Sequence, residues 1–196
     1  MATRLNDILD LAVDSSAINT VKAVIKDAEK INVDLDMSKA IRQAVKRGCV
    51  EILRILFNNG ANFTNDPDLP ILAVHSKNAE TLNFVLNICD GIDVMDESGR
   101  TPLMCASNNE EMSRLLIEKG VDVNISSCNN FTALMSAIAN SNFPVTKLLV
   151  ENGADVFAHY EGKDAIEFAA SLRANRNPKI IRFLLDEMHP TSTPAL

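Results

Sequence analysis

Histidine and cysteine side chains are the residues of this sequence that could carry catalytic or metal-binding chemistry. Three histidines could pair with a thiol in nucleophilic catalysis: His75, His159 and His189. The four cysteines stand far apart, with no C-x-x-C pair and no histidine at ligand spacing: Cys49, Cys89, Cys105 and Cys128. We expect structural or solvent-facing histidines, no metal, and buried or half-buried thiols in a reducing compartment.

The acidic pairs do not indicate an enzyme either, and motifs for phosphate binding or for a serine nucleophile are absent. Glu110-Glu111 and Asp186-Glu187 fall on the outer sides of predicted helices, where a solvated carboxylate is the default interpretation. The sequence has no glycine-rich phosphate loop and no G-x-S-x-G motif. We therefore expect no catalytic residues, no cofactor and no small-molecule substrate.

The composition is that of an acidic, folded protein. The 196 residues are 46% hydrophobic and 23% charged, with a formal net charge of −7. A chain of this length buries about 70% of its unfolded surface, so it needs no disulfide or metal to fold. The acidic balance disfavours binding to nucleic acid or to an anionic membrane. The acidic N-terminal residues predict no signal peptide, so we expect a cytoplasmic protein.

A repeat organises the chain. Residues 101–106 (TPLMCA) return as residues 132–137 (TALMSA) and, in weaker form, as residues 164–169 (DAIEFA). Apolar anchors in the same frame are separated by 30, 32, 31 and 32 residues: Ile41, Ile71, Leu103, Leu134 and Ile166. This period predicts a repeat architecture in which each unit buries its apolar faces against its neighbours.

Each unit is predicted to form two short helices and a turn. Thr101 can cap a first helix through its hydroxyl, and Pro102 supplies a preset φ where no amide donor is needed. A second apolar run at helical spacing follows, as at Met112, Leu115 and Leu116. Glycines stand where a left-handed residue ends these second helices: Gly60, Gly120 and Gly153.

These motifs resemble those of the ankyrin-repeat family. Residues 101–106 are close to the family signature T-P-L-H-x-A, and residues 48–62 resemble the family's second helix and loop. Other residues replace the signature histidine in every unit: Arg42, Leu72, Met104, Met135 and Glu167. The resemblance covers residues 34–188 and implies an all-α repeat solenoid. We expect an ankyrin-repeat array of about six helix-turn-helix units joined by β-hairpin-like loops, with capping first and last repeats.

The repeat register gives the expected boundaries. A divergent N-terminal capping repeat, four repeats and a C-terminal capping repeat are expected at residues 1–33, 34–63, 64–95, 96–126, 127–158 and 159–189. The last repeat carries an insertion at residues 173–177. Residues 190–196 contain too few apolar side chains to pack, so we expect a mobile tail.

The family resemblance implies protein binding without catalysis. We expect a monomeric interaction module, an adaptor or scaffold that binds a protein or peptide on its concave face. Two alternatives stay open. In the first, the chain is an effector that an intracellular bacterium delivers into the host-cell cytosol, and the AT-rich genome of such a bacterium would suit the 20 asparagines. In the second, it is the targeting segment of a larger protein.

Hairpin tips and the inward sides of the first helices are the expected partner contacts, because ankyrin repeats bind ligands there. The tips carry Glu97, Arg100, Asn129, Phe131, Tyr160 and Lys163, with Asn65, Asp66 and Asp68 in the third unit. The first helices supply Arg47, Lys77, Asn108 and Asn140. A basic set formed by Lys46, Arg47, Lys77 and Arg100 is either a recognition surface for an acidic peptide or a solvated face.

Phe131 and Tyr160, the only tyrosine of the chain, are predicted to lie on adjacent tips. One interpretation is an exposed aromatic pair that the repeat core does not need and that acts as an interface hot spot. In that case, replacing both rings weakens partner binding and leaves stability almost unchanged. The other interpretation is that Phe131 folds under its own hairpin while Tyr160 shields the edge of the last unit.

A modification site is also predicted. Leu116 is followed after five residues by Asp122-Val123-Asn124, which resembles the pattern that asparaginyl hydroxylases of animal cells accept in ankyrin repeats. The resemblance implies Asn124 as the hydroxylated residue.

Overall fold

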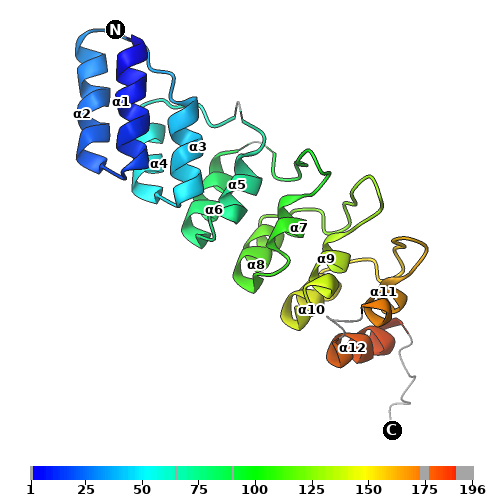
Figure 1. Ribbon diagram of the computed structural model, residues 1–196. Helices are drawn as coiled ribbons and strands as arrows, with labels where there is room; N and C mark the ends of the chain where they lie inside the picture. Colours follow the sequence, from blue (N-terminus) through cyan, green and yellow to red (C-terminus); the bar gives the residue numbers. More distant parts are fainter. Residues whose placement is uncertain (1, 65, 90, 173–176, 189–196) are drawn as a thin grey trace. The chain divides into compact units, whose positions relative to one another are not determined.

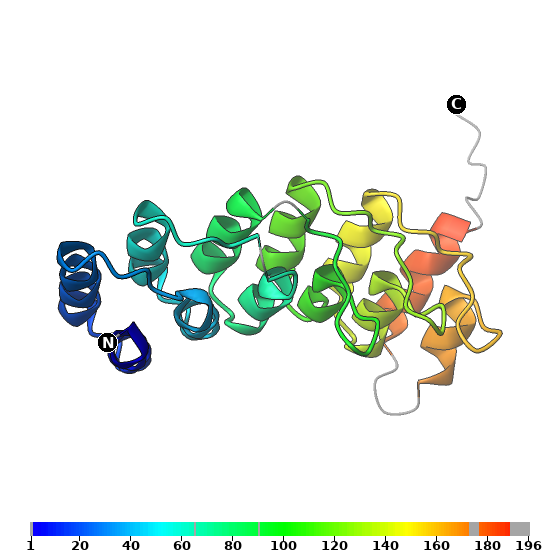
Figure 2. The same cartoon turned by 90° about the horizontal axis from the view of Figure 1, so that it is seen from above.

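The computed structural model describes residues 2–64, 66–89, 91–172 and 177–188. Over these residues it contains twelve α-helices and no β-strand (Figures 1 and 2). The all-α repeat fold expected from the sequence is therefore confirmed. The expectations for Asn65, His189, residues 173–176 and the tail at residues 190–196 fall outside the described residues.

The chain divides into two compact units, Met1–Val94 and Met95–Leu196. Unit 1 contains six helices in its described residues: α1 (Ala2–Asp14), α2 (Ile18–Lys30), α3 (Ser38–Arg47), α4 (Val50–Asn58), α5 (Leu69–His75) and α6 (Ala79–Ile88). The first helices of the pairs, α1, α3 and α5, pack side by side in one layer. The second helices, α2, α4 and α6, form the layer behind them.

Unit 2 repeats this two-layer arrangement. Its described residues form α7 (Pro102–Ala106), α8 (Glu110–Glu118), α9 (Ala133–Ala139), α10 (Phe143–Glu151), α11 (Ala165–Ser171) and α12 (Pro178–Met188). The first helices α7, α9 and α11 contact one another in sequence, as do the second helices α8, α10 and α12. Helix α9 therefore has a neighbour on each side as well as its own partner α10.

Threonine and aspartate side chains begin the first helices of unit 2. The Thr101 hydroxyl accepts a hydrogen bond from the backbone N–H of Met104, and Pro102 occupies the first turn, as expected. Thr132 caps α9 in the same way. Asp164 and Glu167 form a reciprocal capping box at α11. The local residue types thus fix where each first helix starts.

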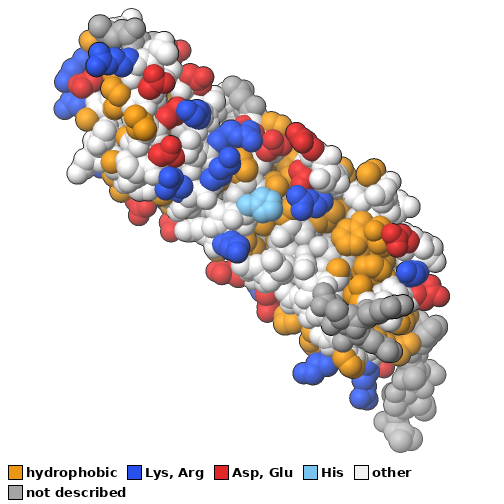
Figure 3. Space-filling model, in the orientation of Figure 1, with side chains coloured by type: hydrophobic (Ala, Val, Ile, Leu, Met, Phe, Trp, Pro, Cys, Tyr) orange, Lys and Arg blue, Asp and Glu red, His pale blue; other side chains and the backbone are white. Residues whose placement is uncertain are grey.

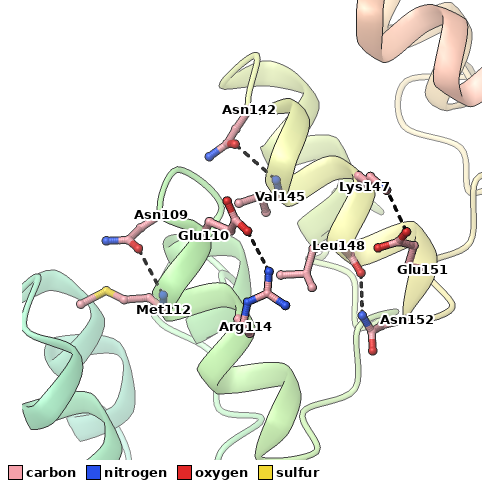
Figure 4. Close-up of polar contacts among 10 residues, drawn as sticks. All are labelled: Asn109, Glu110, Met112, Arg114, Asn142, Val145, Lys147, Leu148, Glu151 and Asn152. Carbon is pink, nitrogen blue, oxygen red and sulfur yellow. Dashed lines mark hydrogen bonds and ion pairs between the residues drawn. The ribbon is translucent and has the colours of Figure 1, made fainter.

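Asparagines begin the second helices and also join neighbouring repeats. Asn109 Oδ1 accepts from the N–H of Met112 at 3.1 Å, and Asn142 Oδ1 accepts from that of Val145 at 3.3 Å (Figure 4). The amide nitrogen of Asn142 also donates to the carbonyl of Ser107, one repeat earlier. One side chain therefore caps its own helix and ties it to the preceding repeat.

Surface ion pairs and glycines complete the second helices. Glu110 pairs with Arg114 on α8, and Lys147 with Glu151 on α10 (Figure 4). Left-handed glycines follow the second helices where the sequence predicted them: Gly60 (φ 81°), Gly120 (φ 85°) and Gly153 (φ 87°). None of the helices in the described ranges combines the length and the apolar composition that a membrane span requires.

Candidate functional site

Four of the hairpin tips are organised by a side chain that accepts the backbone N–H two residues later. These turns recur at the repeat period: Asp36 with Ser38, Asp66 with Asp68, Asp96 with Ser98, and Ser127 with Asn129. The acceptor is a carboxyl oxygen in three of them and a hydroxyl in the fourth. The tips are therefore held by local hydrogen bonds that leave the residues beyond each acceptor at the surface.

Arg100 is bound to its own tip and does not project as a free cation. Its guanidinium lies 2.8 Å from the Asp96 carboxylate, which also accepts the Arg100 backbone N–H at 2.9 Å. Burial disfavours the ionised Asp96 carboxyl, but the hydrogen bonds from Arg100 and Ser98 outweigh it and lower the pKa of Asp96. Burial also raises the pKa of the nearby Cys105 thiol. This corner of unit 2 is a structural ion pair beside a neutral thiol.

Phe131 and Tyr160 form one aromatic cluster with Phe168. The Phe131 and Tyr160 ring centroids are 4.8 Å apart, and the Phe168 centroid lies 6.2 Å from the first and 5.6 Å from the second. All three pairs have edge-to-face geometry, which is the favourable arrangement for aromatic rings. Phe168 is only 8% exposed, whereas the other two side chains are half-buried. Figure 3 shows hydrophobic side chains gathered at the surface beside α9 and α11.

The expectation that the repeat core does not need these two rings is therefore corrected. The sequence placed Phe131 and Tyr160 on adjacent tips, and the rings do meet, but both also pack on a buried phenylalanine of α11. Repeat register could not reveal this contact, because Phe168 lies in the degraded third copy of the signature (DAIEFA). The pair is partly exposed and packs on Phe168.

Replacing both Phe131 and Tyr160 with alanine is expected to lower the free energy of unfolding of unit 2 by about 2 kcal/mol, since half-buried ring area and two edge-to-face contacts are lost. Urea denaturation followed by circular dichroism measures the change. An unchanged urea midpoint would contradict the packing on Phe168.

Uncharged polar side chains lie along the first helices of unit 2. The Ser107 and Ser136 hydroxyls lie 2.7 Å apart, and the Asn140 side chain donates to Ser107 at 3.0 Å. Asn108 and Asn140 are exposed beyond these hydroxyls, at the ends of α7 and α9. The structure therefore offers amide and hydroxyl groups, without formal charge, along the first helices of unit 2.

The remaining predicted tip residues of unit 2 are Glu97, Asn129 and Lys163. Glu97 and Asn129 are exposed. Lys163 is half-buried and pairs with Tyr160 through the backbone, with its N–H donating to the Tyr160 carbonyl at 3.0 Å and its carbonyl accepting in return at 2.9 Å. This backbone pair fixes the hairpin that carries the tyrosine.

Some of the predicted contact residues of unit 1 form ion pairs within the unit, and others do not. Arg47 lies 3.5 Å from Asp14 of α1. Asp66 and Asp68, predicted as tip contacts, both face Arg42 of α3, at 2.6 Å and 3.6 Å. Lys77 is exposed just after α5. Two of the predicted contacts in this unit thus hold the tip to α3.

Asn124, the predicted hydroxylation site, joins two successive loops. Its amide nitrogen donates to the Gly153 carbonyl at 2.9 Å, and its side-chain oxygen accepts from the Asp155 N–H at 2.8 Å. The residue is exposed although both ends of its amide are bonded. Hydroxylation at this position stays a prediction.

The thiols and acids do not assemble into a metal site within the described ranges. No disulfide joins the four cysteines, all of which lie in those ranges. Cys49, Cys89 and Cys105 are half-buried, as expected, whereas Cys128 is exposed at its hairpin tip, which corrects the expectation of a covered thiol. No three His, Cys, Asp or Glu side chains of the described residues converge as metal ligands.

Comparison with known proteins places residues 70–160 in a family model for three ankyrin repeats. The chain is 29% identical over 147 residues to an ankyrin repeat protein of Acanthamoeba polyphaga mimivirus, covering 74% of this chain and 42% of that protein. It is 27% identical over 154 residues to the mouse homologue of B-cell lymphoma 3 protein, covering 75% and 28%. It is 31% identical over 146 residues to the ankyrin repeat and KH domain-containing protein mask-1 of Caenorhabditis elegans, covering 57% and 6%. The chain therefore spans less than half the length of each of these relatives.

Proposed function

Because this chain belongs to the ankyrin-repeat family, whose repeats generally mediate protein–protein interaction, we propose that it is a non-catalytic binding module. In this proposal, a segment of a partner protein lies against the hairpin tips and the first helices. The surface of unit 2 formed by Phe131, Tyr160, Asn108 and Asn140 is the proposed contact, and we call it the aromatic surface.

The observation that supports the aromatic surface most strongly is the packing of the ring pair. Phe131 and Tyr160 are half-buried, and both contact the buried Phe168. A fixed aromatic side chain loses little conformational entropy when a partner covers it, and aromatic anchors supply most of the binding energy at many interfaces. The exposed amides of Asn108 and Asn140 would add hydrogen bonds at its edge.

The test places positive charge on the aromatic surface without touching the rings. The Asn108→Arg/Asn140→Arg variant adds two charges to the first-helix ends, and Glu118→Arg adds the same net charge on α8 of the second-helix layer. Tagged chains capture partners from a lysate of the source cell, and the captured partner is then titrated against each purified variant by calorimetry.

We expect the double variant to bind the captured partner at least about tenfold more weakly, because two interface positions are blocked and each important contact is worth about 1 kcal/mol or more. The Glu118→Arg variant should bind like the parent chain. Equal binding by all three chains would contradict the aromatic surface, provided that their urea midpoints agree.

The compartment and the wider context of the module are part of the same proposal. We propose the cytosol, since four cysteines that form no disulfide suit a reducing compartment. The effector alternative changes where the partner is found, so capture from a host-cell lysate but not from the source cell would favour it. As a targeting segment of a larger protein, the module would use the same surface.

A further inference from the structure

All charged side chains of α3 in unit 1 are basic, and most of them have a carboxylate partner. The helix contains no acidic residue and four basic ones: Lys39, Arg42, Lys46 and Arg47. Three of these have carboxylate neighbours on other elements: Lys39 with Asp10 at 2.8 Å, Arg42 with Asp66 at 2.6 Å, and Arg47 with Asp14 at 3.5 Å. Lys46 is exposed and has no carboxylate within 4.0 Å in the described part of the chain.

Two further basic side chains lie at the neighbouring helix end. His75 closes α5 and Lys77 follows it, and both are exposed with no carboxylate within 4.0 Å among the residues that the structure describes. The ends of α3 and α5 meet, because the Asn78 side chain donates to the Gly48 carbonyl at 3.3 Å. Lys46 and Lys77 both lie within two residues of that hydrogen bond. Figure 3 shows basic side chains and a histidine on the surface over α3 and α5.

Lys77 occupies a backbone position that favours glycine. Its φ is 57°, in the left-handed region, and Gly48 takes the same turn after α3 with φ 69°. In both turns the residue's N–H donates to the carbonyl three residues earlier. The left-handed conformation costs stability for a residue with a Cβ, and such outliers cluster at functional sites. Lys77 therefore places a long cationic side chain at a position where glycine would have less backbone strain.

We propose that Lys46, His75 and Lys77 form a basic surface that binds an acidic segment of the partner protein, one rich in Asp and Glu. This proposal rests on the proposed function and adds the partner's chemistry. Carboxylates of a bound segment would supply the counter-charges that Lys46 and Lys77 lack, which is the electrostatic complementarity that selects partners and speeds association.

A short peptide fits this charge distribution better than a polyanion does. Residues 1–94 contain ten basic and thirteen acidic residues, so unit 1 is acidic as a whole. Asp14 pairs with Arg47, the residue next to Lys46, and Asp10 pairs with Lys39 near the start of α3. An extended nucleic acid or an anionic membrane would meet this surrounding negative charge, whereas a segment of a few residues would not.

The test uses Lys77→Gly, which removes the positive charge and relieves the strain of a left-handed backbone conformation at a residue with a Cβ. Ser16→Gly is the matched control, because Ser16 lies in the turn after α1 with the same left-handed conformation (φ 53°) and carries no charge. The probe is a fluorescein-labelled ten-residue peptide of alternating Glu and Gly, compared with its Gln counterpart by fluorescence anisotropy on the full chain. Thermal unfolding is recorded for each variant.

We expect the Glu peptide to bind at least about tenfold more tightly than the Gln peptide and to weaken markedly between low and high salt. Lys77→Gly should weaken binding about threefold, as expected for one exposed charge pair, without lowering the Tm. Lys46→Gln/Lys77→Gly should weaken it further, and Ser16→Gly should leave it unchanged.

Three results would overturn the proposal: equal binding of the Glu and Gln peptides, unchanged binding by the Lys46→Gln/Lys77→Gly chain, or tighter binding of duplex DNA or anionic vesicles that the same variants abolish. The Asn108→Arg/Asn140→Arg chain separates this inference from the proposed function. If that variant loses its captured partner while the Glu peptide fails to bind the parent chain, only the acidic-segment inference fails.

Discussion

Leu134→Asp is expected to unfold the repeats of unit 2 at neutral pH. Leu134 is 1% exposed on α9, and α9 contacts α7, α10 and α11, so an introduced carboxyl at this position has no route to water. Removing the leucine side chain costs about 3 kcal/mol, and burying an unpaired carboxyl adds several more. The total is comparable to the whole stability of a typical domain, about 5–15 kcal/mol.

Circular dichroism at 222 nm measures this prediction through loss of the helical signal of α7–α12. The variant should recover part of its stability at acidic pH. A buried carboxyl has a raised pKa, so its penalty is absent below the ordinary Asp value of about 3.9 and grows as the pH rises above it.

Asn108→Asp is the control, because it adds the same charge at an exposed position after α7. Leu134→Ala measures the packing contribution alone. A folded Leu134→Asp chain with a urea midpoint close to that of Asn108→Asp would contradict the burial of α9 between its neighbours.

The repeat fold could be predicted from the sequence because its determinants are local and periodic. Thr101 caps α7, and Gly120 ends the second helix of the same repeat in the left-handed conformation. Such features depend on residues within one or two turns of helix, and they recur at each repeat. Helix positions and the two-layer arrangement follow from them.

The state of the candidate site depended on contacts between repeats, which the sequence pattern does not contain. Phe131 and Tyr160 were assigned correctly to neighbouring tips, but whether their rings are free is decided by Phe168, 37 residues after Phe131. The charged residues also differ in ways that the repeat pattern does not show. Arg100 is held by Asp96 within its own tip, whereas Lys77 has no carboxylate within 4.0 Å among the residues the structure describes.

The contacts that the asparagines make between repeats also do not follow from the sequence. The number of asparagines suits an AT-rich genome, but Asn142 caps α10 and also donates to the Ser107 carbonyl of the preceding repeat. Asn124 bonds to Gly153 and Asp155 of the following loop. A residue that satisfies backbone groups of two repeats at once is favoured by the structure itself, whatever the genome that encodes it.

Phe168→Ala is expected to lower the free energy of unfolding of unit 2 by about 3–4 kcal/mol and to release both rings of the aromatic surface. The substitution removes a nearly buried ring that contacts both Phe131 and Tyr160. With that support absent, the two rings gain conformational freedom, and a partner would have to order them on binding. Stability and partner affinity should therefore fall together although no proposed contact residue has been changed.

The measurement exploits the fact that Tyr160 is the only tyrosine and that the chain has no tryptophan. Tyrosine fluorescence therefore reports the surroundings of this one ring, in the native state as well as during urea unfolding. Phe168→Leu is the matched control, because leucine keeps most of the buried volume and should cost less than about 1.5 kcal/mol. If Phe168→Ala leaves both the native tyrosine signal and the captured partner's affinity unchanged, the aromatic surface does not depend on the ring beneath it, and the entropy argument for partner binding at Phe131 and Tyr160 fails.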